Sequence, residues 1–217
     1  MTETSEVNRR KSGRPLSFDR DAVLNKAMLA FWRHGYETTS ISDLIREMGI
    51  KAPSLYAAFG DKKNLFFEAV RLYAGEPSAV RQAIEAAPSS YDAARSVLAN
   101  SIETFTGVDT PPGCLLASST ASGSAASEDV RATVAVYRRE LRDSLQARIE
   151  RDIQEGLVAG DVDAVALANL VVALLQGLSV MARDGEDRAS LTDVAEAAMK
   201  AWPDNMKAIG HGNSVRT

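Results

Sequence analysis

The chain has 217 residues, of which 45% are hydrophobic and 25% charged, and its formal net charge is −4. This balance is typical of one or two soluble globular domains, and it excludes wholesale disorder, a collagen-like fibre and a disulfide-dense mini-protein. A single cysteine, Cys114, excludes an internal disulfide, and two histidines are too few for a histidine-rich metal cage. We therefore expect no metal site and no cofactor.

The charge is distributed unevenly along the chain. Residues 8–63 carry a net charge of +5, whereas residues 64–217 carry −7. A basic N-terminal quarter on an acidic body indicates contact with a polyanion at one end, although an excess of this size also arises by chance on solvated surfaces. Residues 1–15 contain four basic residues and lack the apolar core of a signal peptide, so we expect a flexible basic arm on a cytoplasmic, nucleoid-associated protein.

Apolar spacing predicts four helices in residues 16–76. The first covers residues 19–34 and the third covers residues 52–59, with Pro53 in its first turn. The second covers residues 40–48, where Thr39 or Ser40 can cap it in the manner of a capping box with Asp43. The fourth follows Asp61. Two short helices joined by a tight glycine-containing turn predict a helix-turn-helix at about residues 39–59.

Beyond Gly75 the chain becomes richer in alanine and acidic residues, and it remains helical in pattern. Helices are predicted over residues 79–87, 91–106, 115–122, 128–155, 163–183 and 191–201. The expected fold class is therefore all-α: an N-terminal three-helix helix-turn-helix DNA-binding domain and a C-terminal helical domain at residues 77–205. Residues 206–217 are expected to be a disordered tail.

The helix predicted over residues 163–183 is apolar on nearly every side. It is interrupted by Asn169, Gln176 and Ser179 and is slightly short for a membrane span, so we expect no membrane partner. Such a helix must be buried on every side, which a second subunit would achieve in a four-helix dimer bundle with residues 128–155. The alternative is a central helix in a monomeric bundle. The residues expected at the dimer interface are Leu141, Leu145, Leu170, Leu174 and Leu178.

One segment carries a specific resemblance. Gly35-Tyr36-Glu37-Thr38-Thr39-Ser40-Ile41, followed by Gly49 to Phe66 with its Leu55-Tyr56-Ala57-Ala58-Phe59 run and Lys62, resembles the DNA-binding domain of the TetR/AcrR (tetracycline-repressor-like) family. The match spans about residues 16–76, and the remainder matches only in general plan. The resemblance implies a homodimeric, ligand-released repressor that binds a near-palindromic double-stranded DNA operator. It also implies that residues 77–205 form a helical ligand-binding and dimerisation domain. Lys51 departs from the family pattern, because Ser or Thr often caps the recognition helix there.

Several residues of this segment suit contact with DNA. Lys51, Lys62 and Lys63 stand at the positive ends of helices, which favours an external anion such as phosphate, although lysines can also point into water. The recognition helix has few groups that read bases, so the basic arm is expected to reach the minor groove unless it is a solubilising tail. The predicted DNA-binding residues are Arg14, Thr39, Ser40, Lys51, Ala52, Pro53, Ser54, Tyr56 and Lys62; Thr39 and Ser40 can also act as caps.

The small-molecule effector is not identified by the sequence. Pocket residues are expected where apolar helices meet the Pro111-Pro112 loop: Phe105, Cys114, Leu115, Tyr137 and Met181. Neither paired carboxylates at metal spacing nor a phosphate-binding glycine loop is present, so an enzyme is not expected. Two other functions remain open, a helical adaptor that binds proteins and a thiol-based redox regulator acting through Cys114, which is otherwise a small buried residue.

Overall fold

The computed structural model describes residues 18–119 and 128–203, and this part of the chain contains helices and no strand. The all-α fold with an N-terminal helix-turn-helix and a C-terminal helical domain is confirmed. The predicted arm at residues 1–15, with Arg14, and the predicted tail at residues 206–217 lie outside the described residues. The helices are α1 (Arg20–His34), α2 (Ile41–Met48), α3 (Ala52–Phe59), α4 (Lys62–Ala74), α5 (Pro77–Ala86), α6 (Ser90–Phe105), α7 (Leu115–Ser118), α8 (Glu128–Gln154), α9 (Ala164–Arg183) and α10 (Arg188–Lys200).

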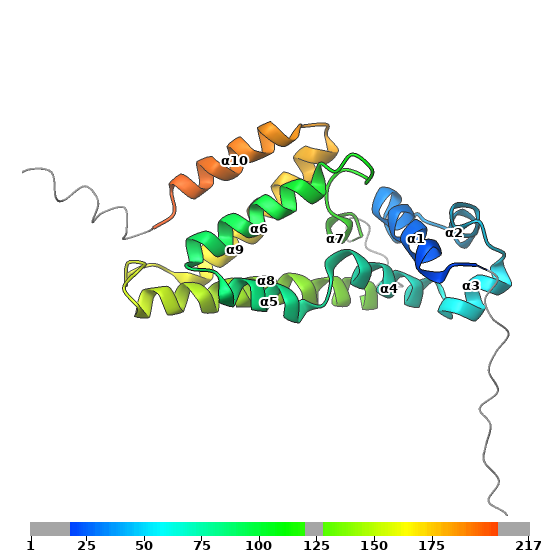
Figure 1. The fold of residues 1–217 in the computed structure, drawn as a ribbon, viewed down its shortest axis with the longest axis horizontal. Coiled ribbons are helices and arrows are strands. Elements are labelled where there is room, and N and C mark those ends of the chain that lie inside the picture. The colour runs from blue at the N-terminus through cyan, green and yellow to red at the C-terminus, as the bar shows by residue number, and fades with distance from the viewer. Residues whose placement is uncertain (1–17, 120–127, 204–217) are drawn as a thin grey trace, which may run out of the picture.

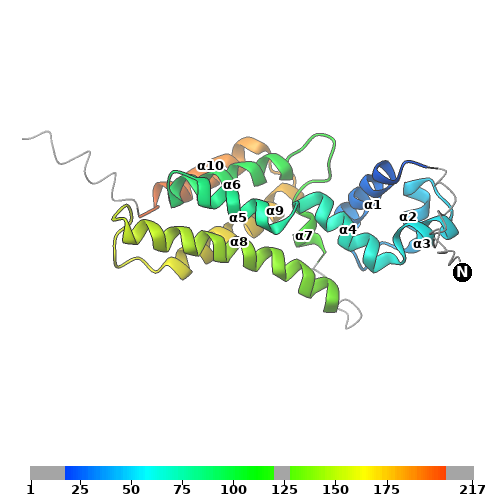
Figure 2. The ribbon, with the colours of Figure 1, turned by 60° about the horizontal axis from the view of Figure 1, so that its bottom comes forward.

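The helices form two groups along the long axis of the molecule. Figures 1 and 2 show α1, α2 and α3 at one end, α4 leading away from them, and α5, α6, α8, α9 and α10 packed together at the other end. We call α1–α4 the head and α5–α10 the body. Because α4 contacts α1 within the head and α8 within the body, it connects the two groups.

The core of the head is aromatic. Phe31 and Trp32 of α1 and Phe66 of α4 are almost fully buried, and the Phe31 and Phe66 rings meet edge to face at 5.2 Å. Leu55 and Phe59 anchor α3 to this core. Three buried residues of the body complete the same cluster: Leu115, Val130 and Val134. The head is therefore not an independent unit, because part of its core comes from α7 and α8.

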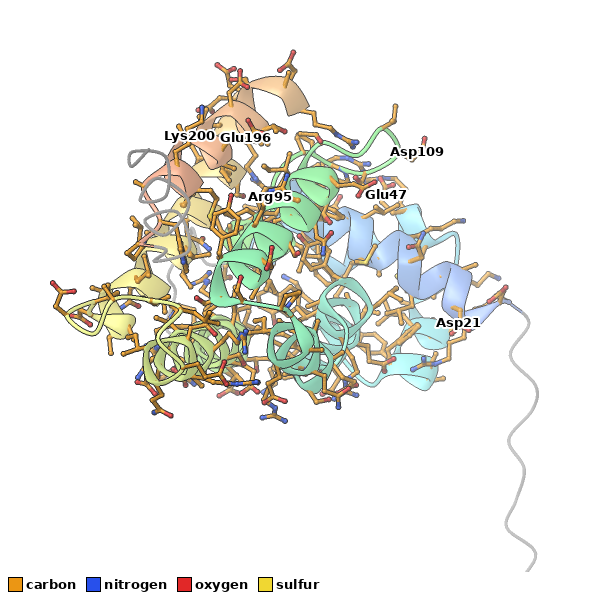
Figure 3. The ribbon with its side chains drawn as sticks, turned by 60° about the vertical axis from the view of Figure 1, so that its left-hand side comes forward. Asp21, Glu47, Arg95, Asp109, Glu196 and Lys200 are labelled. Carbon is orange, nitrogen blue, oxygen red and sulfur yellow. The ribbon has the colours of Figure 1, made fainter. Side chains whose placement is uncertain are left out.

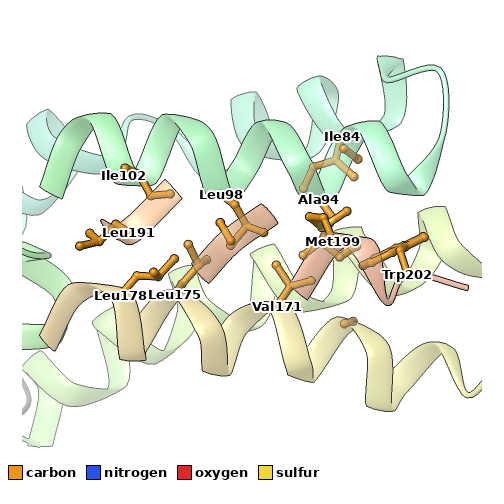
Figure 4. Packing of buried hydrophobic residues seen from close by; sticks show 14 of the residues in the cluster. Ile84, Ala94, Leu98, Ile102, Val171, Leu175, Leu178, Leu191, Met199 and Trp202 are labelled. Atoms are coloured by element: carbon orange, nitrogen blue, oxygen red, sulfur yellow. The ribbon is translucent and has the colours of Figure 1, made fainter. Parts of the chain in front are cut away.

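The core of the body is mainly aliphatic. Figure 4 shows Leu98 and Ile102 of α6 facing Leu175 and Leu178 of α9, with Leu191 of α10 beside them. The α8 helix packs along α9 and α5 and supplies further buried side chains. The predicted helix over residues 115–122 differs from the structure, since α7 ends at Ser118 and residues 120–127 lie outside the described chain.

Candidate nucleic-acid interface and effector cavity

A reciprocal cap fixes the start of α2. The Asp43 N–H donates to Ser40 Oγ and the Ser40 N–H donates to Asp43 Oδ2, each at 3.1 Å. Hydrogen bonds from Ser40, together with one from Arg46, lower the pKa of Asp43 to about 2. Ser40 itself is exposed. The predicted capping box is therefore present, and it leaves Ser40 at a positive helix end on the surface, where an anion can approach.

Thr39 corrects one of the sequence assignments. Its side chain is 1% exposed, and its hydroxyl donates to the Gly35 carbonyl at 2.6 Å. A side chain buried in this way cannot reach a DNA phosphate, so Thr39 is removed from the proposed contact residues. Its hydrogen bond instead fixes the turn between α1 and α2, which positions Ser40.

The recognition helix α3 presents a mixed surface. Lys51, at its N-cap, and Pro53 are exposed, Ala52 and Ser54 are half-buried, and Tyr56 is 50% exposed. Lys51 makes no side-chain capping bond, as the sequence predicts for a lysine at this position. The outward face of α3 therefore offers one cation, one hydroxyl, one phenol and a proline ring.

Two lysines follow Asp61, whose carboxylate accepts the N–H of Asn64 and caps α4. Lys62 Nζ lies 3.4 Å from the Glu37 carbonyl oxygen and 4.4 Å above the Tyr36 ring, and burial lowers the pKa of Lys62. Lys63 forms an exposed ion pair with Asp129 of α8 at 2.8 Å, and this hydrogen bond raises the pKa of Lys63. In the first turn of α4, Lys62 therefore packs against the head, whereas Lys63 forms an ion pair with the body.

One side of α9 is apolar and uncovered. Val165, Leu170 and Val180 are 45%, 58% and 55% exposed, and Ala173 and Gly177 lie along the same side. A Cβ added at Gly177 would meet nothing within 4 Å, so no neighbour in the protomer requires a glycine there. By length and composition alone α9 could cross a membrane, but its other side packs into the body core.

The five leucines predicted at a dimer interface separate into three groups. Leu170 is exposed on the uncovered side of α9, while Leu141 and Leu174 are half-buried against the body core. Leu145 and Leu178 are 0% exposed within a single protomer. The last two assignments were wrong, because these side chains fill the protomer core and leave nothing for a partner to touch.

A cavity of about 230 Å³ lies inside the body next to the head. Five elements line it: α4, α6, α8, α9 and the segment from Cys114 into α7. Three of the predicted pocket residues line it: Phe105, Cys114 and Tyr137. Burial raises the pKa of Tyr137. We call this space the effector cavity.

Two of the proposed pocket residues do not line the effector cavity. Leu115 is 0% exposed and belongs to the cluster that completes the head core, and Met181 packs half-buried against the body core. Sequence reasoning missed most of the lining: Tyr73, Asn100, Ser101, Thr104, Leu116, Arg138, Leu141, Val172, Leu175 and Gln176. One signal could have found part of it, because Gln176 is a half-buried polar residue on a mainly apolar helix.

Contacts from the effector cavity lead directly to the head. The Tyr73 hydroxyl donates to Cys114 Sγ at 3.5 Å, and the Tyr73 ring packs edge to face on Trp32 at 4.7 Å. Trp32 Nε1–H donates to the Gly113 carbonyl at 2.9 Å. Arg183, at the end of α9, donates to the Trp32 carbonyl at 3.0 Å. Direct contacts therefore connect the cavity to α1 and α4.

A larger groove of about 510 Å³ runs between α6 and α10, away from the head. Figure 3 shows Arg95 of α6 and Glu196 and Lys200 of α10, which belong to its lining. Its lining carries several charged side chains, and none of its lining residues belongs to α1–α4. The smaller cavity differs from this groove because its walls include Tyr73 of α4. The described residues hold no cluster of His, Cys, Asp or Glu suited to a metal ion.

The fold and these sites define a helical regulator, in which a helix-turn-helix head is joined to a helical body that contains a cavity. The family model for bacterial regulatory proteins of the tetR family matches residues 23–69, and the tetracycline repressor-like C-terminal domain matches residues 90–199. The chain belongs to the TetR family and is a DNA-binding transcriptional regulator.

Named relatives cover almost the whole chain. The HTH-type transcriptional repressor ComR of Escherichia coli K12 is 35% identical over 218 residues, covering 95% of this chain and 99% of ComR. The uncharacterised regulator YezE of Bacillus subtilis is 28% identical over 189 residues, covering 86% and 97%. A cysteine mutant of the TetR-family regulator CifR, solved in complex with 26-bp double-strand operator DNA, is 39% identical with a TM-score of 0.81, and the match covers 88% of this chain and 100% of that one.

Proposed function

We propose that the protein is a ligand-released repressor that acts as a homodimer on a near-palindromic operator. The observation that carries this proposal is the pairing of an exposed recognition helix with a ligand-sized cavity that shares α4 with the head. ComR is named a repressor, and the CifR structure contains operator DNA, which supports the same role here. A protein-binding adaptor or a thiol regulator is not favoured by these relatives. The DNA target implies a cytoplasmic, nucleoid-associated location.

The proposed DNA surface combines the outward face of α3 with two helix N-termini. Ser40 and Lys62 are placed to position the phosphate backbone, and Tyr56 offers it a hydroxyl. To meet a phosphate, Lys62 must exchange its contact with the Glu37 carbonyl for the anion. Lys51 and Ser54 offer polar groups to base edges, Ala52 and Pro53 offer apolar contact to thymine methyl groups, and Arg14 of the arm enters the minor groove.

The proposed dimer buries the uncovered side of α9. Leu170 and Val180 would lose their exposure there, while Ala173 and Gly177 would let a second helix approach closely. Two heads related by a two-fold axis read two half-sites about 34 Å apart or at a multiple of that distance, which is why the operator is expected to be near-palindromic.

The proposed effector is a small, mostly apolar molecule with a hydrogen-bonding group, because the cavity combines three aromatic rings with polar side chains of α6 and α9. Its binding would displace Tyr73 and therefore α4. An effector that favours the conformation with displaced α4 by a few kcal/mol would release the protein from the operator.

Replacing Leu170 tests the mechanism with little risk to the fold, because this side chain is exposed in the protomer. Leu170→Arg buries an unpaired charge at each copy of the proposed contact. We expect a monomer in light scattering and operator binding weakened roughly a hundredfold or more. The control is Val108→Arg, at a loop residue that is 99% exposed, with unchanged mass and affinity expected. A monomeric Leu170→Arg protein that binds the operator with wild-type affinity would overturn the proposal.

A further inference from the structure

A second cavity, of about 300 Å³, lies at the end of the body opposite the head. It lies where α6 begins and where α8 and α10 end, and Figures 1 and 2 place these ends together, far from α1–α3. None of its lining residues lines the effector cavity. We call it the distal cavity, and it is a separate space.

Three of its lining residues carry polar groups that are buried. Ser90 and Asp152 are 0% exposed, and Trp202 is 6% exposed. Ser90 Oγ and Trp202 Nε1 make no hydrogen bond within the described part of the chain, whereas Asp152 Oδ1 is paired with the Arg148 guanidinium. Burying a polar atom without a partner is costly, and two such atoms around one cavity are unusual unless something else satisfies them.

The charged groups beside this cavity pair with each other. Asp152 Oδ2 accepts the Ser90 N–H at 2.5 Å, and Arg148 lies 3.0 Å from Asp152 Oδ1 as an ion pair in which both side chains are almost fully buried. Arg148 also donates to the Pro88 carbonyl at 2.6 Å. Because the carboxylate and the guanidinium balance each other, the cavity has no uncompensated charge to offer an ionic ligand.

The walls and the unpartnered atoms together define a ligand. Leu157, Val158 and the Trp202 indole supply apolar surface. Trp202 Nε1–H can only donate a hydrogen bond, whereas the Ser90 hydroxyl can donate or accept one. We propose that the distal cavity is a second small-molecule site, and that it takes a compact neutral molecule with an apolar body and one hydroxyl or amide group that both donates and accepts hydrogen bonds. Its volume is at the lower end of the range for ligand pockets.

The two tryptophans of the chain make this directly measurable in the full-length protein. Trp32 and Trp202 give two indole N–H signals in a ¹⁵N-labelled sample, and Trp202→Phe assigns them. Benzyl alcohol is the probe, and toluene, which lacks the hydroxyl, is the matched control. We expect benzyl alcohol to shift the Trp202 signal saturably, and toluene to leave it almost unchanged. The Trp32 signal reports separately on the region of the effector cavity.

Substitution of Ser90 tests whether the unpartnered polar atoms of the distal cavity contribute to binding of benzyl alcohol. Ser90→Ala removes one unpartnered hydroxyl, and we expect the affinity for benzyl alcohol to fall roughly two- to tenfold, as for the loss of one neutral hydrogen bond. Ser144→Ala is the control, because Ser144 is also buried but does not line the cavity. Three outcomes would each overturn the proposal: no saturable shift of Trp202, an equal shift with toluene, or an unchanged affinity in Ser90→Ala. Any of them would leave the distal cavity as a space filled by water only.

Discussion

The head and the body fill their interiors differently. Among the described residues of the head, Thr39 is the one buried polar side chain, and the rest of its core is aliphatic and aromatic. The buried polar residues of the body are Ser90, Ser119, Ser144, Arg148, Asp152 and Ser179, and the effector and distal cavities are among the spaces that interrupt its packing. A close-packed head holds the recognition helix in one orientation, whereas a looser body leaves space for a ligand and a route to rearrange.

The largest expected loss of stability comes from breaking the buried ion pair of the body, Arg148–Asp152. Asp152→Ala leaves Arg148 as an unpaired buried cation, so we expect a loss of about 3–5 kcal/mol in the free energy of unfolding, measured by urea denaturation. The double variant Arg148→Met/Asp152→Ala removes both charges and should recover much of that loss. A loss below about 1 kcal/mol in the single variant would mean that water already reaches the pair.

Alanine substitution of one phenylalanine in the head and one in the body compares how tightly the two interiors are packed. Phe66→Ala in the head removes a ring that is 0% exposed and surrounded by aromatic neighbours, and should cost about 3–5 kcal/mol. Phe105→Ala in the body removes a ring that is 4% exposed but lines the effector cavity. Because this ring has fewer neighbours to lose, we expect a cost nearer 2–3 kcal/mol. Urea unfolding of both variants measures the difference, and equal losses would contradict the proposed contrast in packing.

Within the head, α2 has a full capping box and α3 has none. Lys51→Ser supplies the missing cap and should raise the free energy of unfolding by about 1 kcal/mol. The same change removes an exposed cation from the proposed DNA surface. We therefore expect weaker operator binding and a salt dependence reduced by about one counterion, measured by titration at several salt concentrations. Improved stability with an unchanged salt dependence would remove Lys51 from the interface.

The smallest expected effect concerns pH and the cap of α2. The pKa of Asp43 is about 2 in the folded protein, below its ordinary value of 3.8, so its ionised form stabilises the fold. This contribution is complete above about pH 4 and is lost as the pH falls through 2. Asp43→Asn should therefore reduce the pH dependence of the urea midpoint between pH 4 and 2. Asp109→Asn, in an exposed loop, is the control and should leave that dependence unchanged.

The helices could be predicted from the sequence because each depends on local signals. Apolar spacing, glycine stops and caps such as Ser40 and Asp61 place most helix ends within one to three residues of those observed. Side-chain exposure on a short helix also follows from local geometry, as Tyr56 illustrates. Thr39 was assigned wrongly because two adjacent hydroxyl residues can each cap, and only the fold decides which one turns inward.

The interior of the body could not be predicted in the same way. A helix that is apolar on every side, such as α9, does not reveal which side meets its own chain, so Leu145 and Leu178 were placed at a partner when they fill the protomer core. The effector cavity needs five elements brought together from residues 73 to 176. No local sequence pattern indicates that these five elements pack together. For this reason Leu115 was wrongly predicted to line the pocket.

The shared core of the head also has a consequence for biosynthesis. Residues of α1–α4 leave the ribosome first, but the cluster they form closes only with Leu115, Val130 and Val134. At about 5–20 residues per second, the 60 residues between Ala74 and Val134 take roughly 3–12 s to synthesise. During that interval the aromatic side chains of the nascent head remain partly exposed. A chaperone that binds exposed apolar segments can therefore bind the head before α8 has been synthesised.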